Sequence, residues 1–152
     1  GIDNIFFRLA GVNVSKNTFQ KVLLDNILRE LLILMHLDNI SVTKSNVSLE
    51  KILLYIRTHS EQNITLSSIS REFNMSKSYI SRLFRDFLNT TASHYINQIR
   101  LSNACELLLN SNMPISEIAE KSGYSDQYYF SKIFRKFFSV SPSAFRKNNT
   151  TY

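Results

Sequence analysis

Along most of the chain, apolar residues recur at steps of three and four, which is the spacing of one face of an α-helix. The widest stripe runs through Thr18–Leu37. After residue 48 the same period marks six shorter segments and a final one, which Ser141-Pro142 opens with a cap and a proline at the first helical position. The six are about residues 48–60, 65–73, 76–88, 91–110, 115–122 and 125–138. The pattern predicts an all-α fold.

Residues suited to helix starts and turns lie between these segments. Hydroxyl side chains stand where helices are expected to begin: Ser48, Thr65, Ser76 and Ser125. Asn74 and Gly123 stand at expected turns, because both residue types tolerate a positive φ. The chain holds only 3 glycines and 2 prolines. A β-sandwich or barrel would lack turn residues at this composition.

The N-terminal part differs from the rest. Thr18–Leu37 carries more apolar residues than one stripe needs, so it is either an ordinary buried helix or a dimerisation helix from an upstream regulatory domain. Asp38–Ser48 is polar, lacks periodicity and is interpreted as a linker. We therefore expect residues 1–37 to be a remnant of, or a contact to, an upstream regulatory or dimerisation domain. The main folded domain is expected to span residues 49–147.

Positive charge is concentrated in the second part of the chain. The formal net charge is +6. Up to Ile64 there are seven basic and six acidic residues, whereas from Thr65 onward there are eleven and six, so the C-terminal part carries +5. Such an excess fits binding to a nucleic acid, binding to an anionic membrane surface, or a basic surface that is simply solvated.

Two stretches of the chain match each other at a nearly constant separation. Ile69–Asn74 matches Ile118–Gly123 at an offset of 49, and Ser81–Phe87 matches Ser131–Phe137 at an offset of 50. The second copy therefore has one extra residue, within Tyr124–Tyr129. Each copy is expected to form a short helix, a tight turn and a second helix. This is the helix-turn-helix pattern, in which the second helix docks in the major groove of DNA.

Each second helix has an apolar face and a polar face. The apolar ridge is expected to point inward: Ile80, Leu83, Phe84 and Phe87, then Phe130, Ile133, Phe134 and Phe137. The polar face carries Lys77, Ser78, Ser81, Arg82 and Arg85 in the first copy, and Asp126, Gln127, Tyr128, Ser131, Lys132 and Arg135 in the second. Arginine and lysine can pair with guanine, glutamine with adenine, and hydroxyls with bases or phosphates.

The helix expected between the two copies sets their separation. At 1.5 Å per residue a helix of about 19 residues spans about 28 Å, which is close to one DNA turn of about 34 Å. A straight helix of this length would hold two recognition helices in successive major grooves on one side of a duplex.

Four stretches carry a resemblance to a known family: Ile115–Ala119, Gly123–Asp126, Tyr129–Lys136 and Ser141–Arg146. Together with Arg100, Ala104 and Leu108, they resemble the DNA-binding domain of the AraC/XylS family of bacterial transcription regulators. The resemblance covers about residues 49–147. It implies two helix-turn-helix subdomains joined by a long helix, with double-stranded DNA and RNA polymerase as partners and no cofactor.

The polar faces and the resemblance together assign roles on the two recognition helices. Base readout is expected from Ser78, Ser81, Arg82, Gln127, Tyr128, Ser131 and Lys132. Contact with the DNA backbone is expected from Lys77, Arg85, Arg135 and Lys136. Some positions depart from the family pattern: Ser70 replaces alanine, and Asn74, Asn89 and Ser139 replace glycines. Asn89 can adopt a left-handed backbone, which serine adopts less readily.

Other functions explain fewer of these features. An enzyme is not expected, because the sequence has no phosphate-binding loop, dinucleotide fingerprint or metal-ligand spacing, and His36, His59 and His94 lie on three separate segments. Cys105 is expected to be a buried apolar residue. The alternative function is a helical protein-interaction module that works through residues 18–37. We expect a cytoplasmic protein that does not bind membranes, with a possible homodimer contact through the same residues.

Overall fold

The computed structural model describes Leu28 and residues 44–149, and every regular element within 44–149 is an α-helix. The helices are α3 (Lys44–Thr58), α4 (Leu66–Glu72), α5 (Lys77–Leu88), α6 (Ala92–Asn110), α7 (Ile115–Lys121), α8 (Gln127–Phe138) and α9 (Pro142–Asn149). The predicted all-α fold is thereby confirmed. The predicted helix Thr18–Leu37 lies outside the described residues, apart from Leu28, and so do the rest of residues 1–37 and residues 38–43 of the predicted linker.

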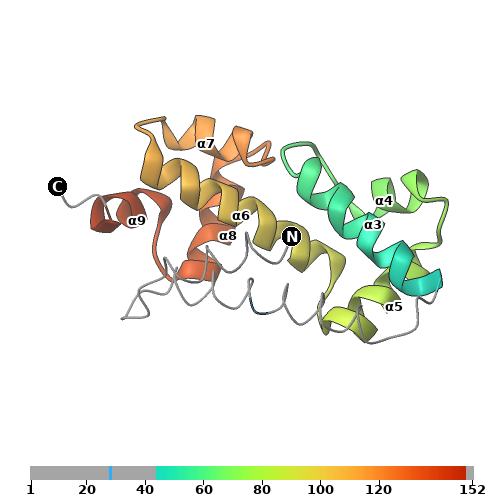
Figure 1. The fold of residues 1–152 in the computed structure, drawn as a ribbon. Coiled ribbons are helices and arrows are strands. Elements are labelled where there is room, and N and C mark those ends of the chain that lie inside the picture. Colours follow the sequence, from blue (N-terminus) through green and yellow to red (C-terminus); the bar gives the residue numbers. More distant parts are fainter. Residues whose placement is uncertain (1–27, 29–43, 150–152) are drawn as a thin grey trace.

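Two separate hydrophobic cores lie along α6, which crosses the middle of the described structure (Figure 1). The first core joins α3, α4 and α5 to the N-terminal part of α6 through Ala92 and Ile96. The second joins α7, α8 and α9 to the C-terminal part through Leu101, Ala104 and Leu108. We call α3–α5 the first unit and α7–α9 the second unit. Each unit has its own core, and α6 belongs to both.

Several helices begin at the side-chain caps that the sequence offers. Thr65 and Ser68 form a reciprocal capping box at the start of α4. The hydroxyls of Ser76 and Ser141 each accept a hydrogen bond from the backbone N–H three residues further on, at α5 and α9. These caps satisfy N–H groups that have no partner within the helix. The predicted starts of these three helices are confirmed.

Two helices begin away from the predicted residue. α3 begins at Lys44, so Ser48 lies inside the helix and the last residues of the predicted linker are helical. Residues 44–47 contain no glycine or proline that would stop the helix from extending upstream. α8 is capped by the Asp126 carboxylate, which accepts from the Tyr129 N–H at 2.7 Å, and not by Ser125. A carboxylate also adds negative charge at the positive end of the helix dipole.

Left-handed backbone occurs at both turns and at the ends of both recognition helices. Asn74 and Gly123, at the turns, have φ of 50° and 84°. Asn89 and Ser139, which end α5 and α8, have φ of 47° and 62°. Ser139 thus adopts a conformation that serine takes less readily than asparagine. The turn residues differ by 49 and the N-caps Ser76 and Asp126 by 50, so the extra residue lies between Gly123 and Asp126.

Replacing Ser139 by glycine is expected to raise the free energy of unfolding by about 0.5–1 kcal/mol. Glycine enters the left-handed region without a Cβ clash, although its more flexible unfolded chain offsets part of the gain. The matched change Asn89→Gly should gain less, because asparagine tolerates this region better. Urea unfolding followed by circular dichroism measures both. Equal gains at the two positions would contradict the greater strain assigned to Ser139.

Candidate nucleic-acid interface

α5 is held in the first core by its apolar face. Three of the predicted anchors are fully or almost fully buried: Ile80, Leu83 and Phe84. The predicted inward position of Phe87 is wrong, since this side chain is 38% exposed and Leu88 is buried instead. Leu88 shares the first core with Ala92 and Ile96, because the chain turns directly from α5 into α6 and α6 covers that side of the helix.

α8 is held in the second core in the same way. Phe130 and Phe134 are fully buried, as predicted, and Ile133 and Phe137 pack against this core while partly exposed. Phe138 is also buried, because the next helix, α9, brings the Phe145 ring to a centroid distance of 5.8 Å. In both units, therefore, the helix that follows the recognition helix buries its last apolar residue.

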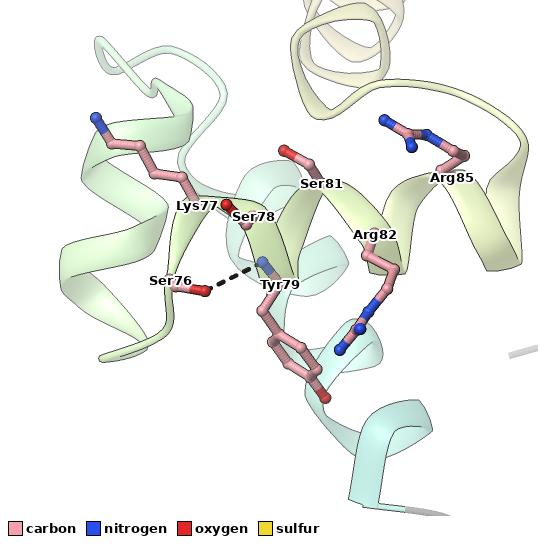
Figure 2. Close-up of a pocket in the computed structure, with 7 residues that line it drawn as sticks. All are labelled: Ser76, Lys77, Ser78, Tyr79, Ser81, Arg82 and Arg85. Atoms are coloured by element: carbon pink, nitrogen blue, oxygen red, sulfur yellow. Dashed lines mark hydrogen bonds between the residues drawn. The ribbon is translucent and has the colours of Figure 1, made fainter.

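The polar face of α5 carries the five residues predicted for the first copy. Ser81 is half-buried. The other four are exposed: Lys77, Ser78, Arg82 and Arg85. With Ser76 and Tyr79 they line an open hollow of about 670 Å³ (Figure 2). In the figure Ser81 and Arg85 point to one side of the helix, and Arg82 points to the other, beside Tyr79. The Arg82 guanidinium carbon lies 5.5 Å from the Tyr79 ring centroid, a cation–π contact.

The polar face of α8 carries the residues predicted for the second copy. Its exposed members are Gln127, Tyr128, Lys132, Arg135 and Lys136, and Ser131 is half-buried. Tyr128 is 87% exposed, the largest value among the exposed large apolar and aromatic side chains of the described residues. An aromatic ring held so far out of the core is available for contact with a partner. Asp126 caps the helix, so its carboxylate is engaged with the backbone.

The two recognition helices correspond residue by residue. Each has 12 residues, and their N-caps and C-caps both differ by 50 in number. Arg82 therefore occupies the same helical position as Lys132, and Arg85 the same position as Arg135. The faces differ where α5 has the acidic Asp86 and α8 has a lysine at the corresponding position, 136. The two helices thus offer cations at two matching positions, and each carries three exposed cations in all, because Lys77 of α5 has Gln127 at the corresponding position of α8.

Two residues that line these faces were not among the predicted site residues. Tyr79 helps to line the hollow on α5, and Tyr129 is 53% exposed at the corresponding position of α8. The repeat itself contains the signal that could have found them, since both copies have tyrosine at this position. A tyrosine there can donate a hydrogen bond to phosphate or stack beside a cation.

The cysteine and the histidines in the described part of the chain pack against other side chains. Cys105 is fully buried, and burial raises the pKa of its thiol, which opposes formation of a reactive thiolate. His59 and His94 stack on aromatic rings of different helices, and His36 lies outside the described residues. Within Leu28 and residues 44–149, no three His, Cys, Asp or Glu side chains gather as metal ligands would. No helix in these residues combines the length and apolarity needed to span a bilayer.

Comparisons with known proteins agree with this geometry. A family model described as a helix-turn-helix domain matches residues 69–148. The chain is 36% identical over 107 residues to the Msm operon regulatory protein of Streptococcus mutans, an alignment that covers 70% of this chain and 38% of that protein. It is 35% identical over 101 residues to the probable transcription factor PqrA of Proteus vulgaris, covering 65% of this chain and 83% of that one.

A solved structure shows the same arrangement of helices. The C-terminal domain of AraT, a response regulator from Geobacillus stearothermophilus, aligns with a TM-score of 0.69 and 35% sequence identity. The alignment covers 72% of this chain and 92% of that domain. The similarity thus extends over almost all of the solved domain, whereas the chain spans only 38% of the Msm operon regulatory protein.

Proposed function

Because the chain belongs to the AraC/XylS family of bacterial transcription regulators, we propose that it binds promoter DNA sequence-specifically with α5 and α8 in successive major grooves. One observation carries this proposal. Two helices of identical length, related by a constant offset of 50, present cations at matching exposed positions, and their units pack on different parts of one connecting helix.

The length of α6 supports docking in successive grooves. α6 is continuous over 19 residues, which corresponds to about 28 Å of helix. One turn of B-DNA is about 34 Å, so a connecting helix of this length is of the right size to support two units that bind grooves one turn apart. An α-helix fits the width of the major groove, where each base pair presents a distinct set of donors and acceptors. A single chain would then read an asymmetric site.

Each exposed residue of the two faces has a proposed role. Arg82 and Lys132 are the central base-reading residues, since arginine and lysine side chains both pair with O6 and N7 of guanine. Ser78, Ser81, Gln127, Tyr128 and Ser131 are assigned to the surrounding base contacts. Lys77, Arg85, Arg135 and Lys136 are assigned to phosphates, where a cation positions the protein without reading sequence.

Replacing Arg82 or Lys132 by alanine is expected to weaken binding to the cognate site by about 1–3 kcal/mol and to relax the preference at the base that the residue reads. Lys51→Ala is the matched control, because Lys51 is exposed on α3 and lies outside both recognition helices. Fluorescence anisotropy with the cognate duplex and with single-base variants of it measures both quantities. Unchanged cognate affinity in both variants would remove Arg82 and Lys132 from the base-reading set.

Partners beyond DNA follow from the proposed role. A promoter-bound regulator acts beside RNA polymerase, which we propose as the protein partner.

A homodimer through residues 18–37 remains a prediction on residues outside the described structure, and sedimentation of the chain as a monomer at high concentration would contradict it. The alternative function, a protein-interaction module that uses the same residues, leaves the matched basic faces of α5 and α8 without a role. We propose that the protein acts in the cytoplasm.

A further inference from the structure

A buried arginine lies on α6 between the residues that pack in the first core and those that pack in the second. Ile96 is the last buried residue of α6 in the first core, and Leu101 is the first in the second core. Arg100, which lies between them, is only 8% exposed. A buried cation is costly unless hydrogen bonds replace its water shell. The hydrogen-bond partners of this guanidinium therefore show which parts of the structure its burial holds together.

Arg100 contacts both units. Its Nε donates to the Ser60 carbonyl oxygen at 3.0 Å, and one terminal nitrogen donates to the Gln62 carbonyl oxygen at 2.7 Å. Both acceptors lie in the loop between α3 and α4, in the first unit. On the other side, the guanidinium carbon lies 5.5 Å from the ring centroid of Tyr124, which follows the turn of the second unit. Burial lowers the pKa of Arg100, and the nearby Tyr124 and Tyr129 oppose this shift.

The second unit also approaches the first directly at Gly123. A Cβ at this position would collide with the Ser60 carbonyl oxygen and would lie 2.8 Å from Arg100 Nε. Gly123 also has a φ of 84°, which side chains rarely adopt. In Figure 1 the loop after α3 and the turn after α7 lie side by side. The turn of the second helix-turn-helix therefore packs on the loop that leads into the first.

Two asparagines on α6 form hydrogen bonds that link the two units, one to each unit. Asn97 lies in the part of α6 that packs in the first core, yet its Oδ1 accepts from the Tyr124 hydroxyl of the second unit at 3.2 Å. Asn103 lies in the part that packs in the second core, yet its Nδ2 donates to the Ser60 hydroxyl of the first unit at 3.0 Å. Asn97, Arg100 and Asn103 are spaced by three residues, so they share one side of the helix.

We propose that Asn97, Arg100 and Asn103 form an orientation brace, in which Arg100 is the central positioning residue that fixes the angle between the two units. This inference rests on the proposed function, because the angle between the units sets which spacing of two DNA half-sites the chain can read. One further contact, the stack of His94 on Phe137 at 5.0 Å, joins α6 to the second unit three residues before Asn97. Without the brace, that stack and α6 remain as a pivot.

The angle can be measured without DNA. Spin labels on Glu72→Cys and Glu120→Cys report the distance between α4 and α7, because both positions are exposed. Cys105, the only native cysteine, is buried with a raised thiol pKa and does not take the label. The parent chain should give one narrow distance distribution, and Arg100→Met a broad one. Gly123→Ala should broaden it as well, by pushing the turn away from Ser60 while Arg100 is intact.

Arg146→Met is the matched control. Arg146 also donates to two backbone carbonyl oxygens, those of Leu108 at 3.4 Å and Met113 at 2.7 Å, but these bonds join α9 to the end of α6 and the loop after it, on the second-unit side. Its loss should lower stability and leave the distance distribution narrow. A distribution for Arg100→Met as narrow as that of the parent chain would overturn the proposal, whatever the effect on stability.

The effect of the brace on DNA binding is measured by changing the spacing between the two half-sites and comparing affinities. One inserted base pair turns the second half-site by about 35° around the DNA axis. Coupled binding of two modules requires matching geometry, so the parent chain should lose about tenfold in affinity or more, and Arg100→Met less than about threefold. An equal loss in both would overturn the role of Arg100 in spacing. If the parent chain ignores spacing, the proposed two-groove function fails, whereas the spin-label result still decides whether the brace exists.

Discussion

Binding to duplex DNA is expected to weaken about a hundredfold when the salt concentration rises from about 50 to about 200 mM. Four exposed cations on the two recognition helices are assigned to phosphates: Lys77, Arg85, Arg135 and Lys136. Each neutralised phosphate releases counterions and contributes about −0.9 to the slope of log affinity against log salt concentration, so four contacts give a slope of about −3.6. Anisotropy titrations at several salt concentrations measure this slope.

Single substitutions divide this salt dependence among the residues. Arg135→Ala should reduce the slope by about one and weaken binding to all duplexes nearly equally, because a phosphate contact carries no sequence information. Lys51→Ala should leave the slope unchanged, since this lysine lies on α3. An affinity that does not respond to salt would mean that the basic faces bind something other than nucleic acid.

Phe134→Ala is expected to lower the free energy of unfolding by about 3–5 kcal/mol, the range for removing a large aromatic ring from a core. The Phe134 ring is fully buried and lies within 4.5–5.6 Å of three other rings, those of Phe130, Phe138 and Phe145. These residues belong to α8 and α9, so the cavity would loosen the recognition helix from its support. Urea unfolding followed by circular dichroism and tyrosine fluorescence measures the loss.

Tyr128→Ala on the same helix is the matched control. This ring is 87% exposed, and its removal should change stability by less than about 0.5 kcal/mol. It should nevertheless weaken DNA binding, because Tyr128 lies on the face assigned to base contact. A loss of stability in Tyr128→Ala as large as that in Phe134→Ala would contradict the division of α8 into a core face and a DNA face.

Most of the fold could be predicted from the sequence because its determinants are local. Caps at Thr65, Ser76 and Ser141, together with apolar residues at helical spacing, define helices through contacts between residues three or four apart. The error on α5 arose where tertiary structure decides. Whether Phe87 or Leu88 is buried depends on how α6 leaves α5, and a pattern within α5 does not contain that information.

The candidate interface was predictable for a different reason. An internal repeat shows which positions of two helices correspond, so that Arg82 and Lys132 could be matched without knowing how the units are placed. The brace on α6 was not predictable in this way. Arg100 was visible only as a match to a family pattern, because its partners are backbone carbonyls 38 and 40 residues away and carbonyls carry no sequence signal.

We propose an arrangement in which α5 and α8 enter successive major grooves on one side of the DNA. Hydroxyl-radical footprinting on a duplex selected from random sequences tests it most directly. We expect two protected patches about 10–10.5 base pairs apart on one face of the duplex, with Arg82→Ala weakening one patch and Lys132→Ala the other. A single protected patch, or one patch that both substitutions weaken equally, would contradict the claim.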